Sequence, residues 1–267
     1  MAQAFTCLFL LLGMMLVAAS FKICAFNIRS FGQAKAANQR VMRALVQGLA
    51  IPALLQKLNR YDPSHHYSCL ESKRLGRSSY KEQNVFVYRR DAVSVMAWCQ
   101  VGDEDARDFA RGPFAVHFHS PYTDFVLLLH HTCPREAVHE LDLLFEVCME
   151  LIHWWKTENV MVLGDLNAGG AYIPMSAWAR IRLRNHPAFH WLISDEEDTT
   201  VSHCTCCSYD RIIVHGEELL SAVVPGSAKP YNFTRALGLS EEEALEISDH
   251  YPVEVELKLA PKTQREL

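Results

Sequence analysis

The sequence has no internal repeat, no low-complexity stretch and no linker that would mark a domain boundary. Its 267 residues therefore predict a single domain rather than two small ones. Hydrophobic residues make up 49% and charged residues 21%, a balance that excludes intrinsic disorder. Positive charge is also not in excess, since the net charge is −5. That value argues against broad, nonspecific electrostatic binding of nucleic acid but is compatible with a local basic patch.

No segment after the first twenty residues is long or apolar enough to cross a membrane. The one apolar run covers residues 7–19 and ends in Ala18, Ala19 and Ser20, which predicts a secretory signal peptide over residues 1–20. No Lys or Arg precedes the run, and a membrane anchor is the alternative. The run is shorter than the ~20 residues that a span needs. The prediction is a single domain over residues 21–267, secreted to the extracellular space through the secretory pathway.

Nine cysteines suit a secreted protein only loosely. Cys7 lies in the predicted signal peptide, and the other eight could form disulfides whose pairing the sequence does not give. Residues 203–207, His-Cys-Thr-Cys-Cys, suggest zinc, but the second ligand cluster that a structural zinc site usually needs is missing. Asn232 begins an Asn-Phe-Thr sequon, which predicts a glycoprotein with a glycan on a surface loop.

Apolar spacing predicts strands interspersed with few helices. A helix interrupted at Pro52 is expected over 41–58, and the longest helix over 135–155 has one face made of Ala137, Leu141, Leu144, Cys148 and Ile152. Single strands are expected at 21–26, 160–163, 211–214 and 253–257, and two strand pairs at 85–88 with 92–98 and 114–118 with 125–129. Together these elements predict one α/β domain of two packed sheets covered by helices.

Residues 164–170, Gly-Asp-Leu-Asn-Ala-Gly-Gly, directly follow the apolar strand 160–163. Asp165 and Asn167 are two apart, so in extended backbone they project to the same side and could ligate a hard cation or orient a phosphate. A plain turn is the alternative, because Gly, Asp and Asn are common turn residues. Polar residues also stand at the ends of the other predicted strands, where open sheets commonly build their sites: Asn27, Glu82, His131, Asp210, Asp249 and His250.

Taken singly, each of these residues has a structural explanation, such as a hydrogen-bonded histidine or a surface ion pair. Together they supply two histidines, several carboxylates and two asparagines. Those groups can hydrolyse a phosphodiester with a divalent cation, one imidazole taking a proton from water and the other giving one to the leaving oxygen. Carboxylate and amide oxygens suit Mg²⁺ or Ca²⁺ rather than a soft metal.

Longer stretches carry a family resemblance that runs through most of the sequence after residue 20. They include FKICAFNIRSFG, LGRSSYKEQNVFVYR, FARGPFAVHFHSPYT, VMVLGDLNAG, CSYDRIIVHG and EEEALEISDHYPVEVELK. The chain resembles secreted endonucleases of the deoxyribonuclease I family. The resemblance implies an α/β four-layer sandwich of two central mixed β-sheets flanked by helices. It also implies a nuclease that cuts double-stranded DNA with little sequence preference.

The resemblance further implies roles for individual residues. His131 matches the general acid, held by Glu82, and His250 matches the base, oriented by Asp210. The residues that match those around the catalytic Mg²⁺ and the scissile phosphate are Asn27, Asp165, Asn167 and Asp249. Arg111 matches a phosphate-contacting arginine and Tyr80 a tyrosine of the minor groove, both in the DNA-binding surface. The family also suggests structural Ca²⁺, a monomer and actin as a further partner.

The sequence departs from the family pattern after its first predicted helix. About fifteen residues are absent there, including an early core strand that ends in a metal-ligand glutamate. Gly170 also stands where the family has a cysteine that is disulfide-bonded to the position of Cys207. The alternative is therefore that the protein is a catalytically impaired or inactive member of the family that binds DNA or actin. A phosphoesterase of lipids or nucleotides is a third interpretation, which LGRSSYKE and CSYDRI argue against.

Overall fold

The computed structural model describes residues 20–28, 51–77, 81–102 and 109–258. Its centre is a six-stranded sheet in the order β4-β5-β6-β7-β9-β8. The strands are β4 (Ser94–Gln100), β5 (Phe114–His119), β6 (Phe125–Leu129), β7 (Val160–Asp165), β8 (Phe189–Trp191) and β9 (Asp210–His215). All neighbouring pairs are antiparallel except β6 and β7, which are parallel. The sheet is therefore mixed, as predicted.

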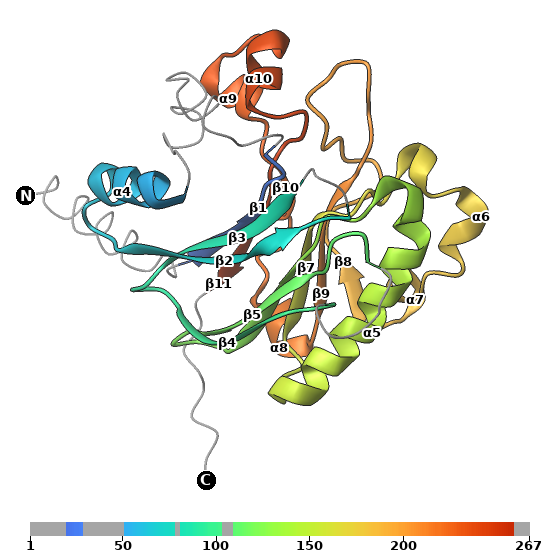
Figure 1. Ribbon diagram of the computed structural model, residues 1–267, viewed down its shortest axis with the longest axis horizontal. Helices are drawn as coiled ribbons and strands as arrows, with labels where there is room; N and C mark the ends of the chain where they lie inside the picture. Colours follow the sequence, from blue (N-terminus) through green and yellow to red (C-terminus); the bar gives the residue numbers. More distant parts are fainter. Residues whose placement is uncertain (1–19, 29–50, 78–80, 103–108, 259–267) are drawn as a thin grey trace, which may run out of the picture.

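The second layer of the sandwich is divided into two small sheets (Figure 1). One has the order β1-β11-β10 and consists of β1 (Ser20–Ala25), β10 (Lys229–Pro230) and β11 (Val253–Lys258). The other pairs β2 (Tyr67–Leu75) with β3 (Glu82–Arg89). Ile23 of β1 and Phe86 of β3 lie in the same core cluster, yet no strand of the described residues joins the two sheets. This division agrees with the expected loss of one early core strand.

Helices cover the outer faces of the sandwich. The main one is α5 (Ala137–Trp155), preceded by a 3-10 turn at Pro134–Glu136, and it packs on one face of the six-stranded sheet. The predicted apolar face of α5 is confirmed, because all five of its residues are buried. The other helices are α4 (Ile51–Tyr61), α6 (Met175–Trp178), α7 (Arg182–Asn185), α8 (Glu217–Ala222), α9 (Phe233–Leu237) and α10 (Glu241–Ile247).

Alternation along the strands builds two cores. In β7, Val160 and Val162 face the core beneath α5, whereas Met161 and Leu163 face the core between the sheets. All six residues of β7 are buried, as the uninterrupted apolar run suggested. The predicted pair of 114–118 with 125–129 is confirmed as β5 with β6.

Two predictions about the elements are corrected. Residues 85–88 and 92–98 do not pair with each other, because β3 pairs with β2 whereas β4 pairs with β5. The polar turn between them carries the chain from one sheet to the other, and Phe86 and Tyr88 each make an edge contact with the ring of Phe118 across the sandwich. The helix predicted to end at residue 58 continues to Tyr61 as α4 (Ile51–Tyr61), with Pro52 in the first turn of that element. Residues 41–50 lie outside the described part.

The cysteines of the described part are all free, so the expected disulfides are not present there. Residues 203–207 form no metal cluster within the described ranges, and the ring of His203 instead lies 3.1 Å from Glu241. Among the helices of those ranges, none combines the length and hydropathy that a membrane span requires.

Candidate functional site

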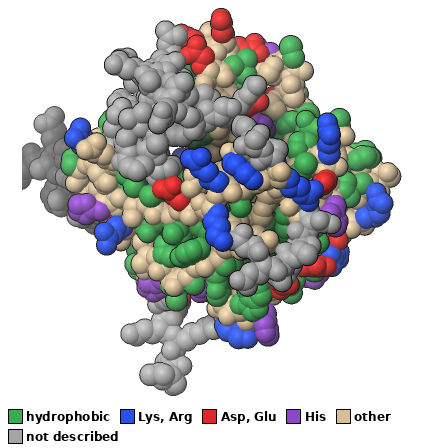
Figure 2. Space-filling view, in the orientation of Figure 1, with side chains coloured by type: hydrophobic (Ala, Val, Ile, Leu, Met, Phe, Trp, Pro, Cys, Tyr) green, Lys and Arg blue, Asp and Glu red, His purple; other side chains and the backbone are tan. Residues whose placement is uncertain are grey.

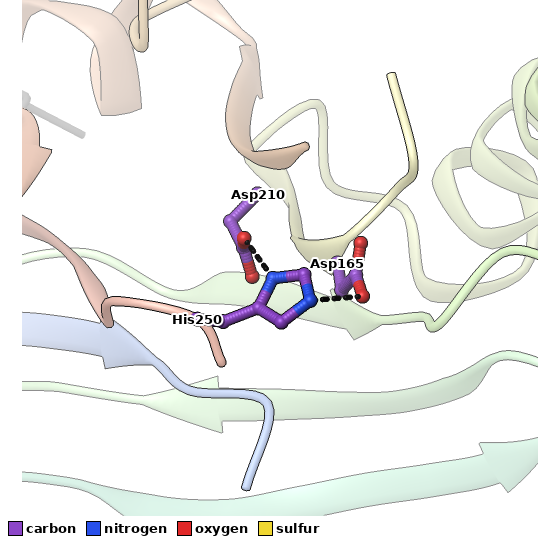
Figure 3. Close-up of side chains that lie close together, drawn as sticks. All are labelled: Asp165, Asp210 and His250. Atoms are coloured by element: carbon purple, nitrogen blue, oxygen red, sulfur yellow. Dashed lines mark hydrogen bonds and ion pairs between the residues drawn. The ribbon is translucent and has the colours of Figure 1, made fainter. Parts of the chain in front are cut away.

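Asp165 is the centre of the candidate site. It is the last residue of β7 and is only 4% exposed. Its Oδ2 atom accepts a hydrogen bond of 2.9 Å from Asn27 Nδ2 and lies 3.3 Å from His131 Nε2 and 3.5 Å from His250 Nε2. Figure 3 shows His250 lying between Asp165 and Asp210. Residues from three parts of the chain thus converge on one carboxylate oxygen.

Each histidine is held from behind by its own carboxylate. His131 Nδ1 lies 2.6 Å from Glu82 Oε2, and His250 Nδ1 lies 2.7 Å from Asp210 Oδ2. A carboxylate accepts the Nδ1 proton and so leaves Nε2 as the atom that faces the site. The two predicted dyads are therefore both formed, and both present the same ring nitrogen to Asp165.

Sheet pairing explains why these side chains meet. Asp165 and Asp210 are direct partners in the antiparallel ladder of β7 and β9. His131 follows β6, which runs parallel to β7, so both chains leave the sheet at the same end. Gly164 permits this approach, because a Cβ atom there would lie 2.2 Å from the carbonyl oxygen of His130. A side chain at position 164 would push the two strand ends apart.

The segment after β7 is both a turn and part of the site. Asp165 Oδ1 accepts the backbone N–H of Asn167, which closes a local turn, and Asn167 has a φ of 46°. Asn167 Nδ2 in turn donates to the carbonyl of Thr132, one residue beyond His131. The turn therefore orients the amide toward the loop that carries the acid. The two interpretations of this stretch are compatible.

Arg111 supports the acid dyad directly. Its Nη1 donates to Glu82 Oε1 at 3.0 Å, while Nε and Nη2 donate to the carbonyls of His131 and Thr132. The guanidinium and the imidazole of His131 thus share the Glu82 carboxylate. These contacts place Arg111 against the His131–Glu82 dyad, and its DNA-contact role stays a prediction.

A buried pair beneath the site was not foreseen from the sequence. Glu140 of α5 and His130 have fully buried side chains, and Glu140 Oε2 lies 3.1 Å from His130 Nε2. Glu140 also accepts the backbone N–H groups of Ala110 and Cys133. These bonds tie the loop before Arg111 to the loop after His131. The only sequence signal was a carboxylate on the otherwise apolar face of the predicted helix.

Charges in the site shift several pKa values in opposite directions. Burial alone would lower the pKa of His250, but the hydrogen bond and charge of Asp210 and the charges of Asp165 and Asp249 raise it to about 9. Burial and the charge of Asp165 raise the pKa of Asp210. Burial would raise the pKa of Glu82, but the hydrogen bond and charge of His131 lower it. The site is therefore rich in negative charge.

A hard cation fits the chemistry of this group. Ligand atoms of Asp165, Asp210 and His250 lie within 4.8 Å of one another. Two buried carboxylates at adjacent ladder positions repel each other, and a cation between them and the amides of Asn27 and Asn167 would relieve that repulsion.

The structure does not place the remaining predicted site residues in the group around Asp165. Asp249 precedes His250 and acts on it through its charge, but it is not in the group of possible metal ligands. Tyr80 lies outside the described residues. Asn232 is an exposed residue that caps α9, where its Oδ1 accepts the N–H of Arg235. Its Nδ2 atom is therefore not needed by the cap.

Comparison with known proteins identifies close relatives. The chain is 43% identical over 265 residues to human deoxyribonuclease gamma, covering 90% of this chain and 87% of that protein. It is 43% identical over 284 residues to canine deoxyribonuclease-1, covering 97% and 99%. Ninety per cent of this chain is about 240 residues. About 25 of the 265 aligned positions therefore have no residue from this chain.

Solved structures share the fold at low sequence identity. An endonuclease/exonuclease/phosphatase from Bacteroides vulgatus matches with a TM-score of 0.58 and 15% identity, covering 91% of this chain and all of that one. Truncated TDP2 from Caenorhabditis elegans matches with a TM-score of 0.60 and 12% identity, covering 90% and 97%. No protein-family model matches the chain.

Proposed function

Because the chain belongs to the deoxyribonuclease I family, we propose that it is a divalent-cation-dependent endonuclease that hydrolyses DNA phosphodiesters with little sequence preference. The observation that carries this proposal is the convergence of the Nε2 atoms of His131 and His250 on Asp165 Oδ2. Hydrolysis of a phosphodiester needs a proton removed from the attacking water and a proton supplied to the leaving oxygen. Two imidazoles that lie on either side of one polar centre, each bonded to a carboxylate, can perform these two transfers.

In the proposed reaction, His250 Nε2 accepts a proton from the attacking water while Asp210 stabilises the imidazolium that results. His131 Nε2 donates a proton to the oxygen that leaves phosphorus, with Glu82 holding the ring. The P–O bond to the water oxygen forms as the P–O bond to the leaving oxygen breaks. Each proton transfer is worth about 10²- to 10⁴-fold in rate.

Asp165, Asn27 and Asn167 would hold the cation, and Asp249, predicted with them, would add its negative charge nearby. Mg²⁺ is the proposed catalytic ion and Ca²⁺ an additional structural one. A bound Mg²⁺ supplies positive charge to the phosphate oxygens. Since Asp165 is one of the charges that raise the pKa of His250, neutralising it would bring that pKa down toward the range that a base needs.

The roles are tested by His131→Ala and His250→Ala, with cleavage of a supercoiled plasmid as the assay. Each variant is expected to lose at least 10²-fold in rate and to keep the melting temperature within a few degrees. His153→Ala is the matched control, because this histidine is exposed on α5. Wild-type turnover in either site variant would disprove the assignment.

Two further proposals concern the protein's route and partners. We propose secretion as a monomer after removal of residues 1–20, with a glycan on Asn232. Expression in animal cells should then yield protein in the medium that begins at Phe21 and shifts in mass on deglycosylation. Cytosolic protein that retains Met1 would contradict this.

A second candidate function is a member of the family that binds DNA or actin without efficient cleavage. The division of the second layer into two sheets favours it, because the absent segment carries the family's metal-ligand glutamate. Tight DNA binding by wild-type protein without cleavage at any Mg²⁺ concentration would support this candidate over the nuclease.

A further inference from the structure

A groove lies at the start of α5, outside the residues of the candidate site. Its volume is about 420 Å³, and it is lined by Arg135, Glu136, Val138, His139, Asp142, Tyr172 and Arg180. Arg135, His139 and Arg180 are exposed. None of the roles assigned above uses these three side chains.

The carboxylates of the groove are already neutralised. Asp142 lies 2.6 Å from Arg182, and Glu136 lies 3.2 Å from Arg77. Arg135 and Arg180 have no ion-pair partner among the residues that the structure describes. The charge left to act on a ligand in the groove is therefore positive, and the imidazole of His139 adds a hydrogen-bond donor.

Two features of the structure link the groove to the catalytic centre. Arg135 is four residues beyond His131, in the 3-10 turn that precedes α5. Tyr172 packs on Tyr209 with ring centroids 5.1 Å apart, and Tyr209 lies 6.3 Å from the ring of His250. A row of aromatic rings thus leads from the base to the groove. Figure 2 shows Lys and Arg side chains across the middle of this face, in the region where Figure 1 draws β2, β3 and the start of α5.

We propose that this groove is an additional phosphate-binding subsite for the DNA strand beside the scissile bond, with Arg135 and Arg180 as its cationic ligands. The inference rests on the proposed function. Guanidinium groups match phosphate oxygens as bidentate donors, and B-DNA offers a negative charge about every 1.7 Å along its axis. A flanking phosphate contact positions the strand and lowers KM, whereas the acid and base set kcat.

The test is a double variant, Arg135→Ala with Arg180→Ala, measured in cleavage of duplex DNA and in DNA binding against salt. Binding is measured on a His131→Ala background so that the DNA stays intact. Each lost phosphate contact should reduce the slope of log K against log[salt] by about 0.9, so the double variant should lose between one and two units. KM should rise about tenfold with kcat changed less than twofold.

The matched control is Arg60→Ala with Arg235→Ala, which removes the same charge from exposed positions on α4 and α9, away from α5 (Figure 1). Arg135→Lys with Arg180→Lys keeps the charge and should restore most of the salt slope. An unchanged slope and KM in the alanine double variant, or an equal loss in the control, would overturn the subsite. Failure of wild-type protein to cleave DNA at all would instead overturn the proposed function.

Discussion

Gly170→Cys should create a disulfide with Cys207. A Cβ atom at position 170 would lie 2.9 Å from Cys207 Sγ. In a disulfide, the Cβ atom of one cysteine lies at a similar distance from the Sγ atom of the other. Both partners come from well-separated segments, since the bond would close a loop of about 37 residues. The relatives' pattern, with a cysteine at this position, therefore fits the backbone that this chain already has.

The size of the effect follows from loop closure and local strain. A loop of this length corresponds to about 4 kcal/mol of lost chain entropy in the unfolded state. Gly170 has a φ of 55°, and a non-glycine residue there costs ~1–2 kcal/mol. The new Cβ also comes within 3.0 Å of Tyr209 Oη, which must move. The net gain expected is about 1–3 kcal/mol, or roughly 3–10 °C in melting temperature for a domain of this size.

Thermal unfolding of the oxidised and reduced variant is the assay, with bond formation verified by mass spectrometry. Gly170→Ser is the matched control, because it carries the same strain and cannot form the bond. Oxidised Gly170→Cys should melt above both its reduced form and the serine variant. If a verified 170–207 bond gave no such increase, the geometry argued for this segment would be wrong.

Three further outcomes are expected. Glu140→Ala should lower stability by roughly 2–5 kcal/mol, measured by urea unfolding, because it removes the partner of the fully buried His130 and the acceptor of the N–H groups of Ala110 and Cys133. Burial lowers the pKa of His130, so its contribution to stability is complete above about pH 6.5 and is lost as the pH falls below that value. His130→Gln, which can still donate to Glu140, should therefore unfold less readily on acidification than wild-type protein does. Inserting a family-like strand with its glutamate between Gln47 and Gly48 should raise both the melting temperature and Mg²⁺-dependent cleavage. An unmodified chain that equals the repaired one would show that the alignment of this region is mistaken.

Much of the site could be predicted because its residues follow buried strands. The run at 160–163 is apolar on both faces, which identifies a central strand, and the polar residues after it can only lie at the sheet end. Glu82 and Asp210 needed the family resemblance to be paired with the correct histidines. Nothing in local spacing says which carboxylate reaches which ring.

What could not be predicted depends on contacts distant in sequence. β2 reads YSCLESKRL and is mostly half-buried or exposed, so it has no apolar alternation to reveal it. The switch of sheet between β3 and β4 is set by packing of Phe86 and Tyr88 across the sandwich, which a turn pattern does not encode. Glu140 reads as an ordinary first-turn acid until its buried partners are known.

The division of the second layer separates two parts of the chemistry. The six-stranded sheet positions three of the site residues: His131 follows β6, Asp165 ends β7 and Asp210 begins β9. His250 is held to that sheet through Asp210. The geometry of the two His–carboxylate dyads therefore does not require a strand that joins the two small sheets, which the described residues do not contain. We expect the proposed cation site to bind an ion more weakly without such a strand, because among the described residues only Asp165, Asp210 and His250 have ligand atoms close enough to share one. Total stability of a domain is only about 5–15 kcal/mol, and each buried backbone group left without a ladder partner costs about 1–3 kcal/mol. The shortened chain should consequently retain its proton-transfer groups while losing stability and cation affinity together.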